Sequence, residues 1–228
     1  IQFHINDASK VADGFVAAIL RGFGVDPFQI GRHFPHELTP FEQTEQTAAL
    51  SIKGKVSRKK SVLSIRYHLS GNLGQIAIPA VGTGGARQDR LWEKTCFEFF
   101  LMQPQAEDAI SAITSKENIG SKENMGGYWE FNLSPNGDWN VFALSGYRQE
   151  LKAESAFSRL PFEAWQGFQG LQIESSIDVS QLVASHQPVL LNVSAVVVDK
   201  AGNEMFWAIA HPDVQADFHH PKSFLLKL

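Results

Sequence analysis

The chain has 228 residues, of which 43% are apolar and 19% charged, a balance typical of a globular protein. Because 20 basic residues face 24 acidic ones, the formal net charge of -4 speaks against a binder of nucleic acid or anionic membrane. A single cysteine, Cys96, excludes a disulfide framework, and no apolar run is long enough for a transmembrane helix. No leader is visible, which favours a cytoplasmic protein.

The first candidate element is an amphipathic helix over residues 8–21, with apolar residues at i, i+4, i+7 and i+8 behind Asp7 as the N-cap. We expect residues 1–44 to form an N-terminal helical extension. From there on, the apolar residues alternate as in strands. Residues 50–57 and 63–69 predict a half-buried hairpin with its turn at Lys59-Lys60.

Further short apolar segments, bounded by Gly, Pro, Asn and Asp, predict more strands along the chain. They cover residues 97–101, 128–134, 139–144, 171–178, 189–198 and 205–210. About eight short strands are typical of an all-β fold. We therefore predict an antiparallel β-sandwich of the jelly-roll type for residues 45–228.

A copied hexapeptide occupies residues 115–126, where SKENIG is followed by SKENMG. It lies between two predicted strands in a polar connection that contains glycine. A chain that tolerates such a copy is expected to expose this loop to solvent.

The segment 128–144 contains Asn136-Gly137 between alternating residues, which predicts a hairpin with a two-residue type I′ turn. That turn would pair Trp129 with Leu144 and make one face of the hairpin apolar. The other face would be a polar surface with one aromatic ring. On this second face we expect Glu130, Asn132 and Trp139.

The strand near residues 96–101 repeats this alternation, with Phe97 on one face and Glu98 on the other. Glu98 and Glu130 are therefore expected to share a surface. A carboxylate in an aromatic strand is costly unless it is solvated or paired, and Arg90 and Arg148 are available partners. The pair is either a structural ion-pair cluster or a shallow site for a polyhydroxylated ligand.

Two carboxylates on one surface also suit a glycosidase, which sets two acids across the scissile bond. A shallow surface borne on strands offers no evident device for raising the pKa of one acid. Hydrolysis is therefore disfavoured, and we predict no enzymatic activity.

Two other groups of residues resemble ligand sites, but a structural role explains each of them. The densest group of metal-ligand residues comprises His211, Asp217, His219 and His220, but it completes no zinc pattern, so hydrogen-bonded ties to the domain are expected. The glycine-rich residues 81–90 lack the strand and helix of a nucleotide site. No metal or cofactor is predicted.

Four blocks of the sequence carry a family resemblance. They read RLWEKTCFEFFL, YWEFNLSPNGDW, GYR and FWAIAHPDVQADFHHP, in this order. Over residues 45–228 the chain resembles an uncharacterised bacterial family of DOMON-like proteins, which is related to the family nine carbohydrate-binding modules. The resemblance implies a β-sandwich with a ligand surface on one sheet.

The resemblance also implies roles for single residues. In the sugar-binding relatives a Trp lies six residues before a strand-borne Glu, as Trp92 and Glu98 do here, and stacks on the terminal sugar. Glu130 or Asn132 stands where a further strand residue holds the sugar, and Trp207 is the nearest candidate for a second ring. The relatives carry basic residues in that middle strand, and their calcium loops find no match, so calcium is not predicted.

Other DOMON relatives bind haem through Met and His, which draws attention to Met102, Met125 and Met205. Met205 and His211 are six residues apart, roughly 20 Å along a strand, which is too far for a direct pair. An axial pair drawn from different strands stays open.

Taken together, the sequence predicts a non-catalytic binding domain for a small polar ligand, most naturally a carbohydrate. The predicted stacking residues are Trp92, Trp139 and Trp207, the hydroxyl-bonding residues are Glu98, Glu130 and Asn132, and Arg148 and Arg90 hold the carboxylates ionised. Two alternatives remain: a haem or metal electron-transfer domain, and a scaffold without a ligand.

Overall fold

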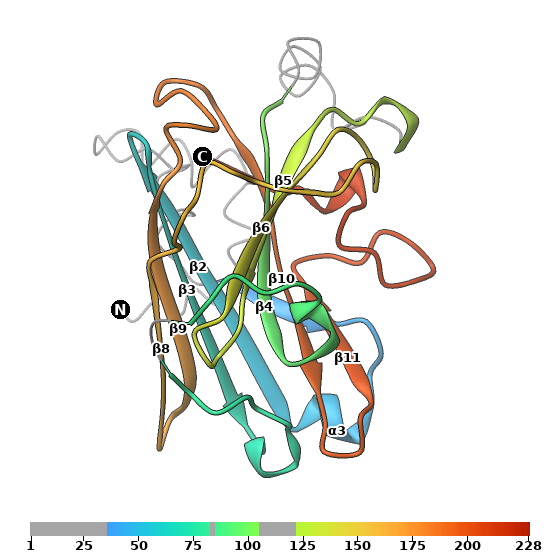
Figure 1. Ribbon diagram of the computed structural model, residues 1–228. Helices are drawn as coiled ribbons and strands as arrows, with labels where there is room; N and C mark the ends of the chain where they lie inside the picture. Colours follow the sequence, from blue (N-terminus) through green and yellow to red (C-terminus); the bar gives the residue numbers. More distant parts are fainter. Residues whose placement is uncertain (1–35, 83–84, 105–121) are drawn as a thin grey trace, which may run out of the picture.

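The structure is a computed structural model that describes residues 36–82, 85–104 and 122–228. Within these ranges almost all regular structure is antiparallel β (Figure 1). No described helix is both long and apolar enough to cross a membrane. The predicted helix at residues 8–21 lies outside the described residues.

Twelve strands and a few single turns of helix make up the described chain. The strands are β1 (His36–Pro40), β2 (Leu50–Lys59), β3 (Val62–Gly71), β4 (Cys96–Met102), β5 (Tyr128–Leu133), β6 (Trp139–Leu144), β7 (Lys152–Ala153), β8 (Phe162–Gly167), β9 (Gly170–Asp178), β10 (Leu190–Val198), β11 (Glu204–Ala208) and β12 (Leu226–Lys227). The helical turns are α3 (Glu45–Ala48), η2 (Leu73–Gln75), η3 (Leu91–Glu93), η4 (Lys122–Asn124) and η5 (Pro221–Ser223).

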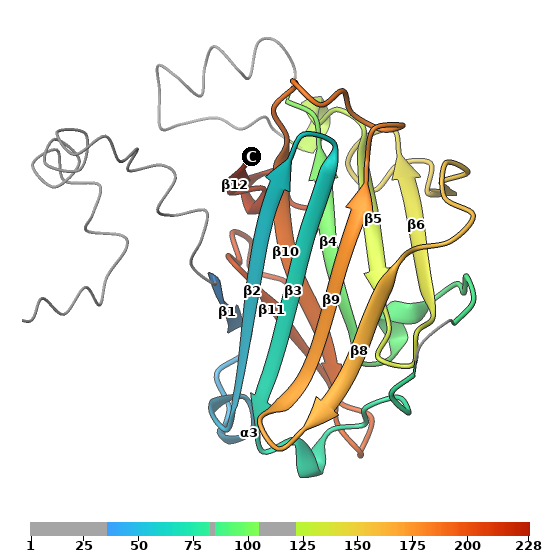
Figure 2. The same ribbon diagram turned by 90° about the vertical axis from the view of Figure 1, so that its left-hand side faces the viewer.

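The strands form one curled antiparallel sheet. Its order is β7-β6-β5-β4-β10-β11-β1-β2-β3-β9-β8, and β12 adds to β10. The half that contains β2, β3, β9 and β8 curls over to face the half that contains β4, β5, β6, β10 and β11 (Figures 1 and 2). The all-β antiparallel prediction is confirmed, but the two layers belong to one continuous sheet.

Strand β1 is the seam between the two halves. It pairs with β2 through Leu38 and with β11 through Thr39 and Pro40. Residues 36–40, which the sequence assigned to an N-terminal extension, are therefore part of the sheet.

The concave side of the curl holds the main core, and the alternation predicted for β2 and β3 is confirmed there. Ile52 and Ile65 are buried against residues of the facing half. The contact is tight at Gly54 of β2, where a Cβ would come within 2.9 Å of Val193 Cγ1 on β10. The hairpin turn lies at Lys60-Ser61, one residue later than predicted.

The β5–β6 hairpin differs from the prediction by one residue. Its loop has three residues, Pro135-Asn136-Gly137, because Ser134 N donates to Asp138 O and Gly137 takes φ 94°. Leu133 therefore pairs with Trp139, and the faces of β6 are inverted. Trp139 points into the main core instead of sharing the polar face with Glu130.

A second apolar cluster covers the convex side of β4 and its neighbours. The C-terminal segment, residues 209–225, lies over this side, where Phe224 packs on Phe100 and Tyr128, and Phe218 packs on Phe206. As a result β4 is buried along its whole length on both faces. Polar side chains on this convex face are thus enclosed rather than solvated.

The second copy of the hexapeptide exposes Glu123 and Asn124 to solvent, as expected, but the residues on either side of them are anchored. Met125 is buried in the second cluster, and Lys122 makes an ion pair with Asp213 of the C-terminal segment. The first copy lies outside the described residues.

Candidate functional site

Strands β4 and β5 place two glutamates side by side on the convex face. Glu98 pairs with Asn132, and Phe100 pairs with Glu130, so the glutamates are diagonal neighbours on the same face. Both are enclosed, with exposed fractions of 3% for Glu98 and 4% for Glu130. The prediction that they share a surface is confirmed.

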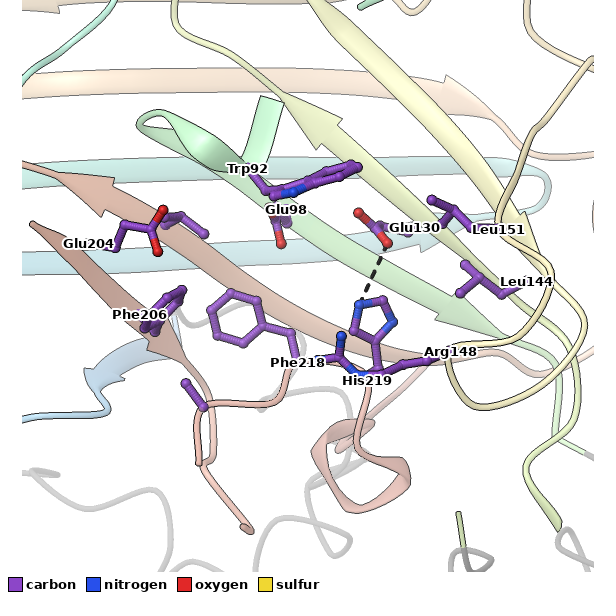
Figure 3. Close-up of a pocket in the computed structure, with 12 residues that line it drawn as sticks. Trp92, Glu98, Glu130, Leu144, Arg148, Leu151, Glu204, Phe206, Phe218 and His219 are labelled. Atoms are coloured by element: carbon purple, nitrogen blue, oxygen red, sulfur yellow. Dashed lines mark ion pairs between the residues drawn. The ribbon is translucent and has the colours of Figure 1, made fainter. Parts of the chain in front are cut away.

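These glutamates form the floor of a hollow of about 370 Å³, which we call the carboxylate pocket. It is lined by Trp92, Glu98, Glu130, Leu144, Arg148, Leu151, Val196, Glu204, Phe206, Ala216, Phe218 and His219. In Figure 3 the two carboxyl groups lie between the indole of Trp92 and the rings of Phe218 and His219. The volume falls within the range of roughly 300–1,000 Å³ found for small-molecule sites.

Burial raises the pKa of both glutamates. The pKa of Glu98 is raised well above its ordinary value by desolvation and by the neighbouring charge of Glu130. Desolvation also raises the pKa of Glu130, although Asn132, which donates to Glu130 Oε1 at 2.8 Å, and Arg148 act in the opposite direction. Of the two arginines expected to keep these groups ionised, Arg148 lowers the pKa of Glu130, whereas Arg90 pairs with Glu93 instead. The buried strands do supply a device for raising a pKa.

One oxygen of the floor is left without a partner. Glu98 Oε1 is buried and accepts or donates no hydrogen bond, and neither does Ser194 Oγ on the neighbouring strand β10. Ser194 is directly opposite Glu98 in the sheet. A buried polar atom without a partner costs about 1–3 kcal/mol, so this part of the site is poised to accept a ligand group.

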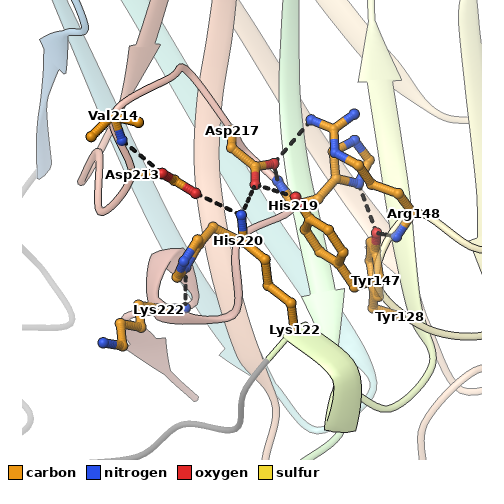
Figure 4. A network of polar contacts seen from close by, with 10 residues as sticks. All are labelled: Lys122, Tyr128, Tyr147, Arg148, Asp213, Val214, Asp217, His219, His220 and Lys222. Atoms are coloured by element: carbon orange, nitrogen blue, oxygen red, sulfur yellow. Dashed lines mark hydrogen bonds and ion pairs between the residues drawn. The ribbon is translucent and has the colours of Figure 1, made fainter.

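The C-terminal segment that walls the pocket is fixed by Asp217 (Figure 4). Asp217 accepts from Tyr147 Oη at 2.7 Å and from Arg148 Nη2 at 2.9 Å. Burial raises the pKa of Asp217, but these two hydrogen bonds outweigh it and hold the pKa below its ordinary value. The network therefore anchors the wall through an ionised carboxylate.

His219 belongs to the same wall and is uncharged. Its Nδ1 lies 2.7 Å from Tyr128 Oη, and its Nε2 lies 3.8 Å from Glu130 Oε2. Burial and the nearby Arg148 lower the pKa of His219 to about 3. The imidazole thus offers the pocket a neutral polar edge.

The structure brings together five of the predicted site residues and separates the other three. Trp92, Glu98, Glu130 and Arg148 line the carboxylate pocket, and the fully buried Asn132 supports Glu130 from below. Trp139, Trp207 and Arg90 lie elsewhere: Trp139 and Trp207 are in the main core, and Arg90 is at the surface in an ion pair with Glu93.

Several lining residues escaped the sequence analysis. Phe206 and Glu204 come from β11, and Phe218 comes from the C-terminal segment. The block around Trp207 was noted, but alternation along β11 puts Phe206 on the face opposite to Trp207. The hydrophobic pattern alone could not tell which of the two faces carries the pocket.

The remaining candidates of the sequence have other surroundings. The methionines at 102, 125 and 205 are packed within the two apolar clusters, and His211 Nε2 contacts Thr39 O at 2.9 Å. Among the described residues no group of three or more His, Cys, Asp or Glu side chains is arranged to hold a metal ion. The Cys96 thiol is fully buried, and desolvation raises its pKa well above the ordinary value.

A second hollow, of about 650 Å³, opens beside Trp129 and Glu154 at the end of β5. There the polar groups already satisfy each other, since Trp129 Nε1 donates to Glu154 Oε2 at 3.0 Å. The carboxylate pocket, with its unpartnered acid, is the stronger candidate for a ligand site.

Comparison with known proteins gives structural matches only. No family model matches the chain, and no curated protein matches its sequence. A Bacteroides uniformis protein that has been assigned as carbohydrate-binding matches with a TM-score of 0.52 and 15% identity, over 92% of this chain and 89% of that one. Two structures of a family nine carbohydrate-binding module from Caldicellulosiruptor kristjanssonii match less well. The complex with cellotriose has a TM-score of 0.48 and 10% identity, and the match covers 85% of this chain and 80% of that one. The complex with glucose has a TM-score of 0.44 and 11% identity, and the match covers 84% of this chain and 80% of that one. The fold of this chain is therefore similar to that of the Bacteroides protein.

Proposed function

We propose that the protein is a non-catalytic carbohydrate-binding protein that holds one sugar ring in the carboxylate pocket. The similarity in fold to the assigned carbohydrate-binding protein of Bacteroides uniformis supports this class of function. The pocket supplies the two kinds of group that sugar recognition needs. It has hydrogen-bonding oxygens at the floor and aromatic rings at the sides.

The observation that carries the proposal is the buried, unpartnered Glu98 Oε1 beside the ring of Trp92. A sugar hydroxyl can donate to this oxygen or accept from it when Glu98 is protonated, which relieves the cost of leaving it unbonded. The apolar C–H face of the same sugar ring would pack on the indole. Glu130 and the neutral His219 would bond adjacent hydroxyl groups.

The test is a titration of glucose, cellotriose and related oligosaccharides by calorimetry, with a Trp92→Ala variant. Loss of one stacking ring should weaken binding by at least about tenfold, since such contacts are worth roughly 1–3 kcal/mol in aromatic burial. Trp165→Ala is the matched control, because Trp165 lies on β8 in the far half and is 39% exposed.

Reducing ends are measured in the same incubations, and no release of sugar is expected. The proposal fails if the wild-type protein binds none of the sugars, or if Trp165→Ala weakens binding as much as Trp92→Ala. If reducing ends are released steadily and Glu98→Gln abolishes this release, the protein is a glycoside hydrolase and not a binding protein. Two enclosed carboxyl groups are chemically able to perform that reaction.

A further inference from the structure

The carboxylate pocket has an unusual balance of charge for a sugar site. Three of its lining residues are acidic, namely Glu98, Glu130 and Glu204. Its basic groups are already engaged or uncharged: the Arg148 guanidinium is paired with Asp217, and His219 is neutral. The lining therefore carries three acidic residues against one charged base, Arg148, which is paired with Asp217 and also lowers the pKa of Glu130.

Aromatic rings complete this arrangement. Trp92 lies on one side of the carboxyl groups and Phe218 on the other, and the rings of Phe206 and Phe218 are 6.0 Å apart (Figure 3). The negative faces of such rings attract cations, and cages of aromatic and acidic side chains suit an ammonium group. The enclosed, unpartnered Glu98 Oε1 offers an acceptor to an N–H donor.

On these grounds, and resting on the proposed function, we infer that the pocket prefers a sugar carrying a free amine, whose ammonium group binds between Glu98 and Glu130 under the aromatic rings. An ammonium group provides three donors and a positive charge, which a hydroxyl group lacks. It would stabilise both carboxylates in their ionised form.

Proton release follows from this geometry. In the free protein burial keeps the pKa of Glu98 high, so a cationic ligand that ionises Glu98 must displace its proton. The ionisable groups around the pair are Tyr67 on β3, Cys96 on β4, Tyr128 on β5, Glu204 on β11, Arg148, and Asp217 and His219 of the C-terminal segment. Both floor glutamates combine a raised pKa with a place in the pocket lining, so the displaced proton comes from this pair.

The experiment compares three β-1,4-linked trimers of the same backbone: cellotriose, the glucosamine trimer and the N-acetylglucosamine trimer. Calorimetry at pH 6.5 in two buffers of different ionisation enthalpy measures both affinity and proton release. We expect the glucosamine trimer to bind at least about tenfold more tightly than cellotriose, because a charged hydrogen bond is worth roughly 1.5–3 kcal/mol. Only the glucosamine trimer should release a proton.

Glu98→Gln should bring the ratio of the two affinities close to one. Glu163→Gln on the exposed face of β8 controls for general attraction between a polycation and an acidic protein, and should leave the ratio unaltered. Equal affinities, tighter binding of the N-acetylated trimer, or a preference that survives Glu98→Gln would overturn this inference while leaving the proposed function in place. Failure of all three trimers to bind would overturn both.

Discussion

Glu98 is a single residue whose burial lowers the stability of the protein when its carboxyl group is ionised. It lies in β4, which is buried along its whole length, and its raised pKa means that ionising it opposes folding. A carboxyl whose pKa is higher in the folded than in the unfolded protein binds more protons when folded. Its stabilising contribution is therefore present at low pH and is lost as the pH rises through the folded pKa.

Replacing Glu98 by Gln should consequently stabilise the protein at high pH. The difference in free energy of unfolding between Glu98→Gln and wild type should increase from pH 4.5 to pH 8, by about 1.4 kcal/mol for each unit by which the pKa is raised. Urea denaturation at a series of pH values measures it. Glu204→Gln, at an exposed position of β11, should change stability by less than about 0.5 kcal/mol. A difference for Glu98→Gln that decreases with pH would show that Glu98 is ionised in the folded protein.

The positions of some residues of the carboxylate pocket could be predicted from the sequence, but the pKa values of its glutamates could not. Alternation along β4 and β5 sufficed to place Glu98 and Glu130 together, whereas a ring at Trp92 was expected only from the resemblance to the sugar-binding relatives. The burial that sets their pKa values comes from Phe218 and the rest of the C-terminal segment. That segment is more than a hundred residues away in sequence from Glu98, so no local pattern reveals its position.

At the scale of elements, the β5–β6 hairpin shows the effect of a one-residue error. Asn136-Gly137 did predict a turn, but Pro135 joins it, and Gly137 takes the left-handed position of a three-residue loop. Because side chains alternate along a strand, the one-residue shift moved Trp139 from the predicted site face into the core. The strand itself was placed correctly.

The loop geometry makes Gly137 hard to replace. Its φ of 94° is strained for any residue with a Cβ, so Gly137→Ala should lower the free energy of unfolding by about 1–2 kcal/mol. Gly167→Ala is the matched control, since Gly167 has an ordinary φ and a Cβ there meets nothing within 4 Å. Thermal denaturation compares the two. Equal stability of Gly137→Ala and wild type would contradict the three-residue loop.

The longer strands could be predicted from alternation, whereas the short ones could not. Strands β7 and β12 contain two residues each, which is too few to show a period. Strand β1 (His36–Pro40) contains a proline and a single buried residue, Leu38, so its pattern does not distinguish it from a loop. Of these strands, β1 joins the two halves into one sheet, β7 forms one edge of it, and β12 adds to β10.

At the scale of the whole molecule, the pocket exists because the chain's end returns to the convex face. Asp217 holds this segment through Tyr147 and Arg148, which follow β6. The pKa of Asp217 is lower in the folded protein, so its contribution to stability is present above its ordinary value and is lost as the pH falls through the folded pKa.

Asp217→Asn should loosen this wall without unfolding the sheet. We expect a loss of about 1–3 kcal/mol in stability, as for a buried hydrogen bond to a charged group, and weaker sugar binding. Hydrogen exchange should accelerate at the amides of residues 214–220 and stay unchanged in β2 and β3. Glu174→Gln, which removes the exposed pair with Arg66, should cost at most about 1 kcal/mol and leave that exchange unaltered. Uniform acceleration throughout the protein would mean that Asp217 supports the fold as a whole.

The hydrogen bond from Tyr67 Oη to the Glu98 main-chain oxygen, 2.5 Å long, links the floor of the carboxylate pocket to the opposite half of the molecule. Tyr67 is fully buried on β3 and packs against Phe97, the residue before Glu98. The main chain at Glu98 is therefore fixed when the protein folds, before any ligand binds. Binding should then cost little conformational entropy of this main chain. Ligands of different affinity should therefore differ chiefly in their dissociation rates.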